Sequence, residues 1–179
     1  KRAIVSLLEK LGENRPAALF LGEIGRSGSS SLRHACNVAL VSVLIGLKLD
    51  FYLMRERPKV PSYEARDVSN LGVGAQLHDV GMLTLDAETI DRWHLNQDES
   101  DPKFQAHVHA GYERVRNDLD PSASAVVLHH HQRYDGTGFV VSGSARALHG
   151  SEIHVFARIC AAADLLDRIR HRREVGEAP

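Results

Sequence analysis

The stretch AQLHDVGM, residues Ala75–Met82, sets an imidazole and a carboxylate side by side among apolar residues and a glycine. The surrounding pattern over residues 68–81 predicts a helix that ends at Gly81. Burying the carboxylate of Asp79 is costly unless the group is paired or bound to a metal. The His-Asp pair is therefore either a local polar contact or one part of a larger constellation, and the rest of the chain decides.

Composition limits the classes of function that the chain can have. Its 179 residues, 43% hydrophobic and 25% charged, suit one ordinary domain with a sizeable core. The net charge of -1 gives no electrostatic case for nucleic acid or an anionic membrane as a partner. Cys36 and Cys160 lie in apolar runs, which predicts small buried hydrophobes in a reducing cytoplasm. The basic run RIRHRR, residues 168–173, predicts a solvated helix end.

The pattern is helical nearly throughout, with no sustained strand alternation, and predicts an all-α, single-domain helical bundle. The longest apolar stretch is too short to cross a bilayer. We expect a helical extension over residues 1–28, the bundle over 29–173 and a flexible tail over 174–179. Within the bundle, we expect a polar linker over residues 58–67 and a long loop over 135–150. The expected helices cover residues 3–11, 31–57, 68–81, 86–95, 101–119, 120–132 and 151–173.

Histidines and aspartates recur at the ends or in the interiors of these helices. Each has a simple explanation when it is taken alone. His34 could be a polar helix start, His78 and Asp79 a capping pair, and His107 a surface residue beside His109. The tract over residues 129–131 could be a surface feature, and Asp164 could pair with Arg158 or Arg168 on its own helix.

Taken together, these residues are five imidazoles and two carboxylates on five expected helices. Neutral imidazole suits Fe, Mn, Ni and Zn, and a helical bundle can aim side chains from several helices at one interior point. Adjacent residues on a helix point about 100° apart, so an adjacent pair serves two neighbouring ions better than it chelates one. This arrangement predicts that Asp79 bridges two divalent ions.

Four segments in this order resemble the HD-GYP family of the HD superfamily of metal-dependent phosphohydrolases: LHDVGM, HVHAGYERV, HHQRYDGTGF and LHGSEIHVFARICAAADLLD. The resemblance implies an HD-type helical fold and hydrolysis of cyclic di-GMP to pGpG and GMP. It implies that two divalent ions, Fe or Mn before Zn or Ni, are bound. Asp79 would be shared between the ions, and the other ligands would be His34, His78 and Asp164 for one ion and His107, His130 and His131 for the other. The resemblance also implies a diguanylate cyclase or a fused sensor or receiver domain as partner.

The sequence departs from the family pattern at substrate-contacting positions. Met82 stands where the family has a phosphate-contacting lysine, and Phe139 and Val140 replace the tyrosine and proline of the GYP signature. Gln132 replaces a glutamate. Ser30 stands where some members have a glutamate for a third ion, so a third ion is not expected.

These departures leave several functions open. Arg133 is a candidate phosphate contact that would offset the loss at Met82, or else an exposed arginine at a loop edge. With Asp79 it forms the expected catalytic pair. The chain is then a phosphodiesterase of attenuated activity, a weak or inactive cyclic-dinucleotide binding and signalling module, a phosphohydrolase for another nucleotide, or a purely structural bundle.

Overall fold

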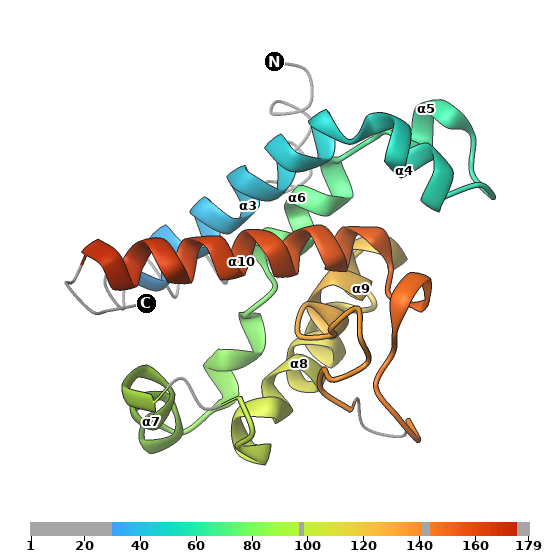
Figure 1. The fold of residues 1–179 in the computed structure, drawn as a ribbon. Coiled ribbons are helices and arrows are strands. Elements are labelled where there is room, and N and C mark those ends of the chain that lie inside the picture. The colour runs from blue at the N-terminus through green and yellow to red at the C-terminus, as the bar shows by residue number, and fades with distance from the viewer. Residues whose placement is uncertain (1–29, 97–98, 141–143, 175–179) are drawn as a thin grey trace.

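The computed structural model describes residues 30–96, 99–140 and 144–174, which form helices joined by turns and loops and contain no strand (Figure 1). This confirms the all-α class for the described part of the chain, while the predicted helix at 3–11, the extension over 1–28 and residues 175–179 lie outside it. The α-helices are α3 (Ser30–Lys48), α4 (Asp50–Glu56), α5 (Ser62–Ala65), α6 (Ser69–Gln76), α7 (Ala87–Asn96), α8 (Pro102–Val115), α9 (Pro121–His129) and α10 (Val155–Glu174). Two short 3₁₀ helices are η1 (Val80–Thr84) and η2 (Gly150–Glu152).

The main core lies where α10 crosses α3, with α6 packed against α3 and α9 packed against α6 and α10 (Figure 1). Leu53 of α4 and Phe156 of α10 are fully buried there, among small apolar residues of α3 and α6. Burial of these apolar side chains is the main favourable term for the fold. Because α3, α6, α9 and α10 share this core, the start of α3, the ends of α6 and α9 and the middle of α10 are held close together.

A second core joins α6, η1, α8 and α9 and includes the buried residues Leu77, Val80 and Val127. The starts of α8 and α9 follow their sequence signals, since Asp101 and Asp120 accept hydrogen bonds from the backbone N–H groups of Lys103 and Ser122. Asp86, the first residue of the helix predicted over 86–95, accepts a hydrogen bond from the N–H group of Thr89 in the same way.

The helix predicted over residues 68–81 is wrong at its C-terminal end. Helix α6 ends at Gln76, and the chain then turns so that η1 can begin at Val80. The N–H group of Leu77 still bonds to the carbonyl groups of Val73 and Gly74, while its side chain is buried in the second core. The turn therefore presents residues 78 and 79 on a tight bend rather than on a regular helix.

Other boundaries also differ from the prediction. The long apolar helix breaks at Leu49, where α3 and α4 bend by 85°, and α4 ends before Pro58 as expected. The expected linker contains α5, and α9 ends at His129 instead of residue 132. Cys160 is buried as predicted, but Cys36 is exposed, although its Sγ accepts a hydrogen bond from Gln76 of α6. Among the described helices, none alone is long and apolar enough to span a membrane, although α3 and α4 pass such a test as a bent pair.

His154 precedes α10 and gives the fold a pH dependence. Its Nδ1 accepts a hydrogen bond from the N–H group of Phe156, so the ring serves as the helix cap only when Nδ1 carries no proton. Burial, together with the charges of Arg57 and Arg158, lowers the pKa of His154 to about 4, whereas Asp120 opposes this shift and His129 adds to it.

Stability should therefore be full above pH 6.5 and should fall as the pH drops toward 4, because only the unfolded chain takes up the proton over that range. We expect His154 to cost about 1–2 kcal/mol of stability at pH 5 relative to pH 7. Urea unfolding of the protein and of His154→Gln at both pH values measures this cost, since other groups cancel in the difference. An equal loss of stability in both proteins would contradict the assignment.

Candidate metal centre

The structure brings the seven metal-binding candidates close to one another. They come from separate elements that the two cores hold against one another: His34 from α3, His78 and Asp79 from the turn before η1, His107 from α8, His130 and His131 from the end of α9, and Asp164 from α10. Two groups of donor atoms lie close enough to hold an ion. One contains His34, His78 and Asp79, and the other contains Asp79, His107, His130 and His131.

Asp79 belongs to both groups because its two oxygens face different histidines. Its Oδ2 lies 3.2 Å from His78 Nε2 and 3.7 Å from His34 Nε2. Its Oδ1 lies 3.4 Å from His107 Nε2 and 3.5 Å from His130 Nε2. One carboxylate thus stands between two sets of imidazoles, which is the arrangement that a bridging ligand needs.

Backbone carbonyl groups fix the direction of three histidine rings. The Nδ1–H groups of His78, His107 and His130 donate to carbonyl oxygens three residues earlier, at 2.8, 2.6 and 3.0 Å. A carbonyl oxygen can only accept, so each Nδ1 carries the proton and each Nε2 is left pointing at Asp79. Metal-binding histidines are commonly held in this way.

The inward nitrogen atoms lack adequate protein partners. His78 Nε2 is buried and has no hydrogen-bond partner among the described residues. His107 Nε2 and His130 Nε2 face each other at 3.3 Å, although both rings have already placed a proton on Nδ1. Buried polar atoms are nearly always satisfied in native proteins, so these donors fit divalent ions.

His34 is held by residues that the sequence analysis did not select. Its Nδ1 lies 2.8 Å from Asp167 Oδ2, and Asn37 donates to the other oxygen of Asp167. His34 Nε2 faces Asp164 Oδ1 at 3.3 Å. Asp167 lies three residues after Asp164, and Asn37 three residues after His34, so helical spacing was the signal that could have found both.

In the absence of ions, the carboxylates of Asp79 and Asp164 favour the protonated form of His34, whereas His131 favours its neutral form. Burial lowers the pKa of His34, but the hydrogen bond to Asp164 and the charge of Asp79 raise it to about 9. Burial, followed by the charge of His130, lowers the pKa of His131 well below its ordinary value. Burial raises the pKa of Asp79, but the charge of His78, when that ring is protonated, brings it well below its ordinary range. An ion entering beside His34 must therefore displace a proton.

The positions of His107, Asp164 and Arg168 decide between the simpler explanations for single residues. His107 is fully buried whereas His109 is exposed, so His107 is not a surface residue. Asp164 pairs with Arg168 at 2.8 Å, as one alternative allowed, while Arg158 pairs with Glu56. The prediction of a solvated helix end is wrong for Arg168, which is 24% exposed and is drawn inward by Asp164.

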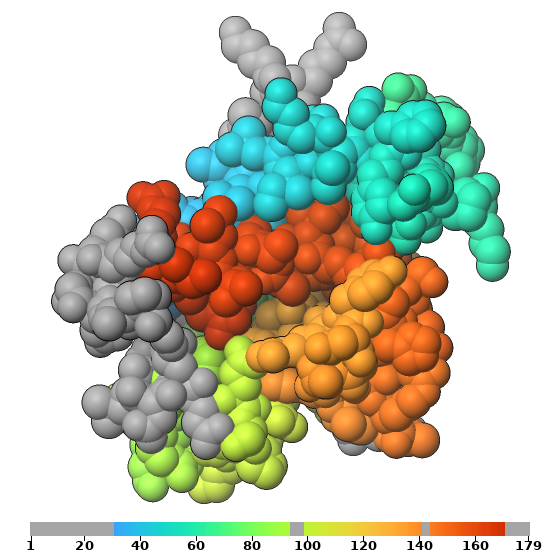
Figure 2. All heavy atoms as spheres, in the orientation of Figure 1, coloured from blue at the N-terminus to red at the C-terminus, as the bar shows by residue number. Residues whose placement is uncertain are grey.

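A cavity of about 670 Å³ adjoins the centre, a size typical of small-molecule sites. It is bordered by α10, whose face is seen in Figure 2, and by the residues that follow α9. His130 and His131 line it, together with the guanidinium-bearing residues Arg133, Arg158 and Arg168. The candidate phosphate contact Arg133 is 60% exposed, and its guanidinium group forms an ion pair with Glu99. Arg133 is therefore exposed, as one alternative expected, but it is held at the cavity by this ion pair.

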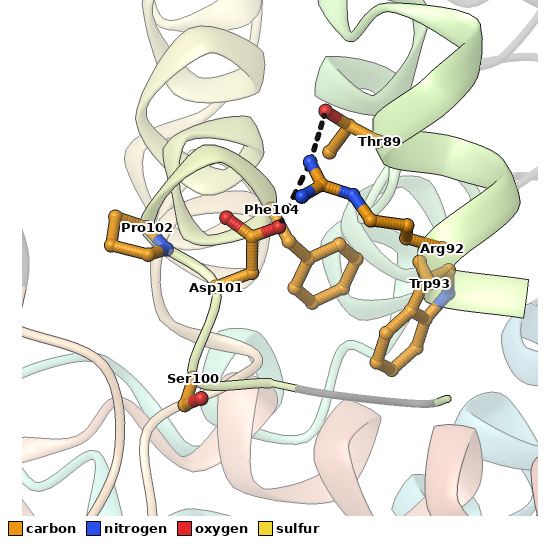
Figure 3. Close-up of a pocket in the computed structure, with 7 residues that line it drawn as sticks. All are labelled: Thr89, Arg92, Trp93, Ser100, Asp101, Pro102 and Phe104. Atoms are coloured by element: carbon orange, nitrogen blue, oxygen red, sulfur yellow. Dashed lines mark hydrogen bonds and ion pairs between the residues drawn. The ribbon is translucent and has the colours of Figure 1, made fainter. Parts of the chain in front are cut away.

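A smaller cavity of about 300 Å³ lies between α7 and the start of α8 (Figure 3). Arg92 spans it, bonded to Thr89 and Asp101, and the ring of Trp93 stacks on Phe104 at 4.0 Å. Phe104 also contacts the rings of His107 and His131. Phe104 therefore lies between this cavity and the candidate metal centre, where its ring supports the rings of His107 and His131.

Comparisons with known proteins agree with this geometry. The chain is 31% identical over 116 residues to the cyclic di-GMP phosphodiesterase response regulator RpfG of Xanthomonas campestris pv. campestris (strain 8004). That match covers 63% of this chain and 29% of the relative, so the chain spans less than a third of the relative's length. A model of the HD domain family matches residues 31–169, and the chain therefore belongs to the HD domain family.

Proposed function

We propose that this member of the HD family is a binuclear metal-dependent phosphodiesterase that hydrolyses cyclic di-GMP to pGpG and onward to GMP. The observation that carries the proposal is the position of Asp79, whose two oxygens face two separate groups of imidazoles. The similarity to a relative named for cyclic di-GMP hydrolysis supports this choice of substrate.

In this proposal His34, His78 and Asp164 hold one ion, His107, His130 and His131 hold the other, and Asp79 is shared. Fe and Mn are the proposed ions, with Zn and Ni compatible with the same donors. Bound divalent ions supply a water of lowered pKa and offset negative charge on the phosphodiester. The protein's own task is to hold these ligands rigid, which the carbonyl groups behind His78, His107 and His130 do.

The cavity beside the centre suits an anionic, aromatic substrate. Its cationic groups can bind phosphate, and we propose Arg133 as one phosphate contact. The ring of Tyr134 is 68% exposed beside them and can stack on a base, and the apolar side chain of Leu165 on α10 lines the same cavity.

The departures from the family pattern affect this substrate region more than the proposed ligands. Met82 packs against the cluster formed by Phe104, Val108 and Phe139, so it contributes apolar packing and no charge. Phe139 stacks on His131 at 4.3 Å, which supports that ring without the hydroxyl of a tyrosine. By analogy with loss of an oxyanion donor, a missing phosphate contact costs about 10²-fold in rate. We therefore expect slow turnover.

Cyclic di-GMP incubated with the Mn²⁺-loaded or Fe²⁺-loaded protein should yield pGpG and GMP, separated by chromatography. Treatment with a chelator should stop hydrolysis, and returning the metal should restore it. His107→Ala should lower the rate by about 10²-fold or more, because it removes a buried ligand candidate. His109→Ala is the matched control, since it removes an exposed histidine from the same helix.

The outcomes separate the proposed function from two of the other functions that the sequence leaves open. Binding of cyclic di-GMP without product over long incubation would replace the proposal with a binding and signalling module. Hydrolysis of bis(p-nitrophenyl) phosphate but not of cyclic di-GMP would point to another nucleotide or phosphoester. Equal rates for His107→Ala and His109→Ala would remove the metal centre from the reaction.

The relative is named as a response regulator and is longer than this chain. We propose accordingly that the domain works in the cytoplasm with a receiver or sensor domain, or with a diguanylate cyclase as partner. Reconstitution with such a domain should change the rate of hydrolysis.

A further inference from the structure

Glu99, on the turn before α8, places its carboxylate between two arginines at the edge of the cavity. Its Oε1 lies 2.9 Å from Arg168 Nη1, and its Oε2 lies 2.9 Å from Arg133 Nη2. The same Oε1 is 3.7 Å from Nδ1 of His131, one of the ligand candidates. An anionic group of the chain therefore lies directly beside the proposed metal centre.

The two guanidinium groups reach this point from separate elements. Arg133 belongs to the turn after α9, whereas Arg168 lies on α10 and holds Asp164 Oδ2 through its Nη2 at 2.8 Å. The Nε atom of Arg168 is buried and has no hydrogen-bond partner among the described residues. Arg168 thus contacts a ligand candidate with one nitrogen and Glu99 with another, at the border of the cavity.

Paired guanidinium groups around a planar anion are the arrangement that binds phosphate well. The Glu99 carboxylate stands in for two phosphate oxygens. The three residues that contact Glu99, namely His131, Arg133 and Arg168, follow it by 32, 34 and 69 residues in the sequence. The cluster around Glu99 therefore depends on the fold and is not a local turn contact.

We propose that Arg168 and Arg133 form the phosphate subsite of the enzyme, and that Glu99 occupies this subsite as an internal competitor until a substrate phosphate displaces it. Arg168 supplies the principal contact, because its link to Asp164 fixes it relative to the metal centre. This inference rests on the proposed phosphodiesterase function, and it adds the phosphate-binding residue and a carboxylate that lowers affinity for the substrate.

The decisive variant is Glu99→Gln, which keeps the shape of the side chain and removes its charge. We expect it to lower the KM for cyclic di-GMP by about tenfold with little change in kcat, since the competing charge-assisted bonds are weakened. Arg168→Gln should raise KM by about tenfold or more, and Arg168→Lys should restore part of the loss. The matched controls are Glu152→Gln and Arg146→Gln, which break a similar exposed ion pair away from the cavity and should change neither constant.

A second measurement does not require turnover. Calorimetric titration of the metal-free protein with inorganic phosphate should show tighter binding for Glu99→Gln by about tenfold. Adding Arg168→Gln to that variant should abolish the gain, and circular dichroism would confirm that both proteins are folded. A merely structural ion pair would give no such gain in affinity.

The results separate this inference from the proposed function. Hydrolysis by the unmodified protein with an unchanged KM and unchanged phosphate affinity in Glu99→Gln would overturn the subsite and leave the phosphodiesterase standing. Tighter phosphate binding in Glu99→Gln without hydrolysis by any variant would support the subsite and overturn the function.

Discussion

Replacing Asp79 with alanine is expected to slow hydrolysis of cyclic di-GMP by about 10³-fold or more, a larger loss than removal of one oxyanion donor. Asp79 provides the only carboxylate that both groups of donor atoms share within the described residues. Its loss leaves imidazoles alone at the ion held by His107, His130 and His131, and a single carboxylate, Asp164, at the other. Neutral imidazoles cannot offset the charge of neighbouring cations. The ion content should therefore fall together with the rate.

Elemental analysis of protein prepared without a histidine tag measures the ion content directly. Asp79→Asn separates charge from volume, because the amide keeps the size of the side chain and loses the negative charge. Asp91→Ala, which removes an exposed carboxylate of α7, is the control and should keep both the ions and the rate. Full ion content and undiminished hydrolysis in Asp79→Ala would contradict the bridging role.

Local sequence signals account for much of the fold. The helices predicted over 86–95, 101–119 and 120–132 start at Asp86, Asp101 and Asp120, and each aspartate is a helix cap, because a short side-chain oxygen can satisfy a free N–H group two or three residues later. The helical periodicity of apolar residues also predicted α8, α9 and α10, although not the break between α3 and α4 or the separate helix η1. These effects act within one or two turns, so one sequence is enough to detect them.

The candidate metal centre could be anticipated in residue type but not in geometry. The grouping of histidines and aspartates gave the candidates, and the resemblance assigned them to two ions. The division of the Asp79 oxygens between two groups required the fold, because His34 and His107 lie on helices that meet only through tertiary packing. The same holds for Glu99, whose partners Arg133 and Arg168 are distant in sequence.

The turn after α6 could not be predicted, because the helical pattern continues to Gly81 and a glycine is a common helix end. What Gly81 provides instead is space. A Cβ atom added there would lie 1.9 Å from the carbonyl oxygen of His107 and 2.7 Å from the backbone nitrogen of Gly111. The glycine lets η1 lie directly against α8, which brings Asp79 to His107.

Gly81→Ala should therefore destabilise the protein by about 3 kcal/mol or more, the upper part of the range for overpacked sites. Backbone atoms form the contact, so relief requires η1 and α8 to separate rather than a side chain to rotate. We expect the melting temperature to fall by about 6–12 °C. Because the separation also moves His107 away from Asp79, ion binding should weaken even at temperatures where the variant is folded.

Thr84→Ala is the control for this variant, since it alters the same 3₁₀ helix and removes one hydrogen bond, from the Thr84 hydroxyl to the carbonyl oxygen of Gly81. It should cost about 1 kcal/mol and leave the ion content intact. Thermal unfolding with and without Mn²⁺ compares the two variants. If Gly81→Ala had the same melting temperature as Thr84→Ala, and Mn²⁺ raised both melting temperatures equally, the prediction would be wrong. The close approach of η1 to α8 would then not be what holds Asp79 and His107 together.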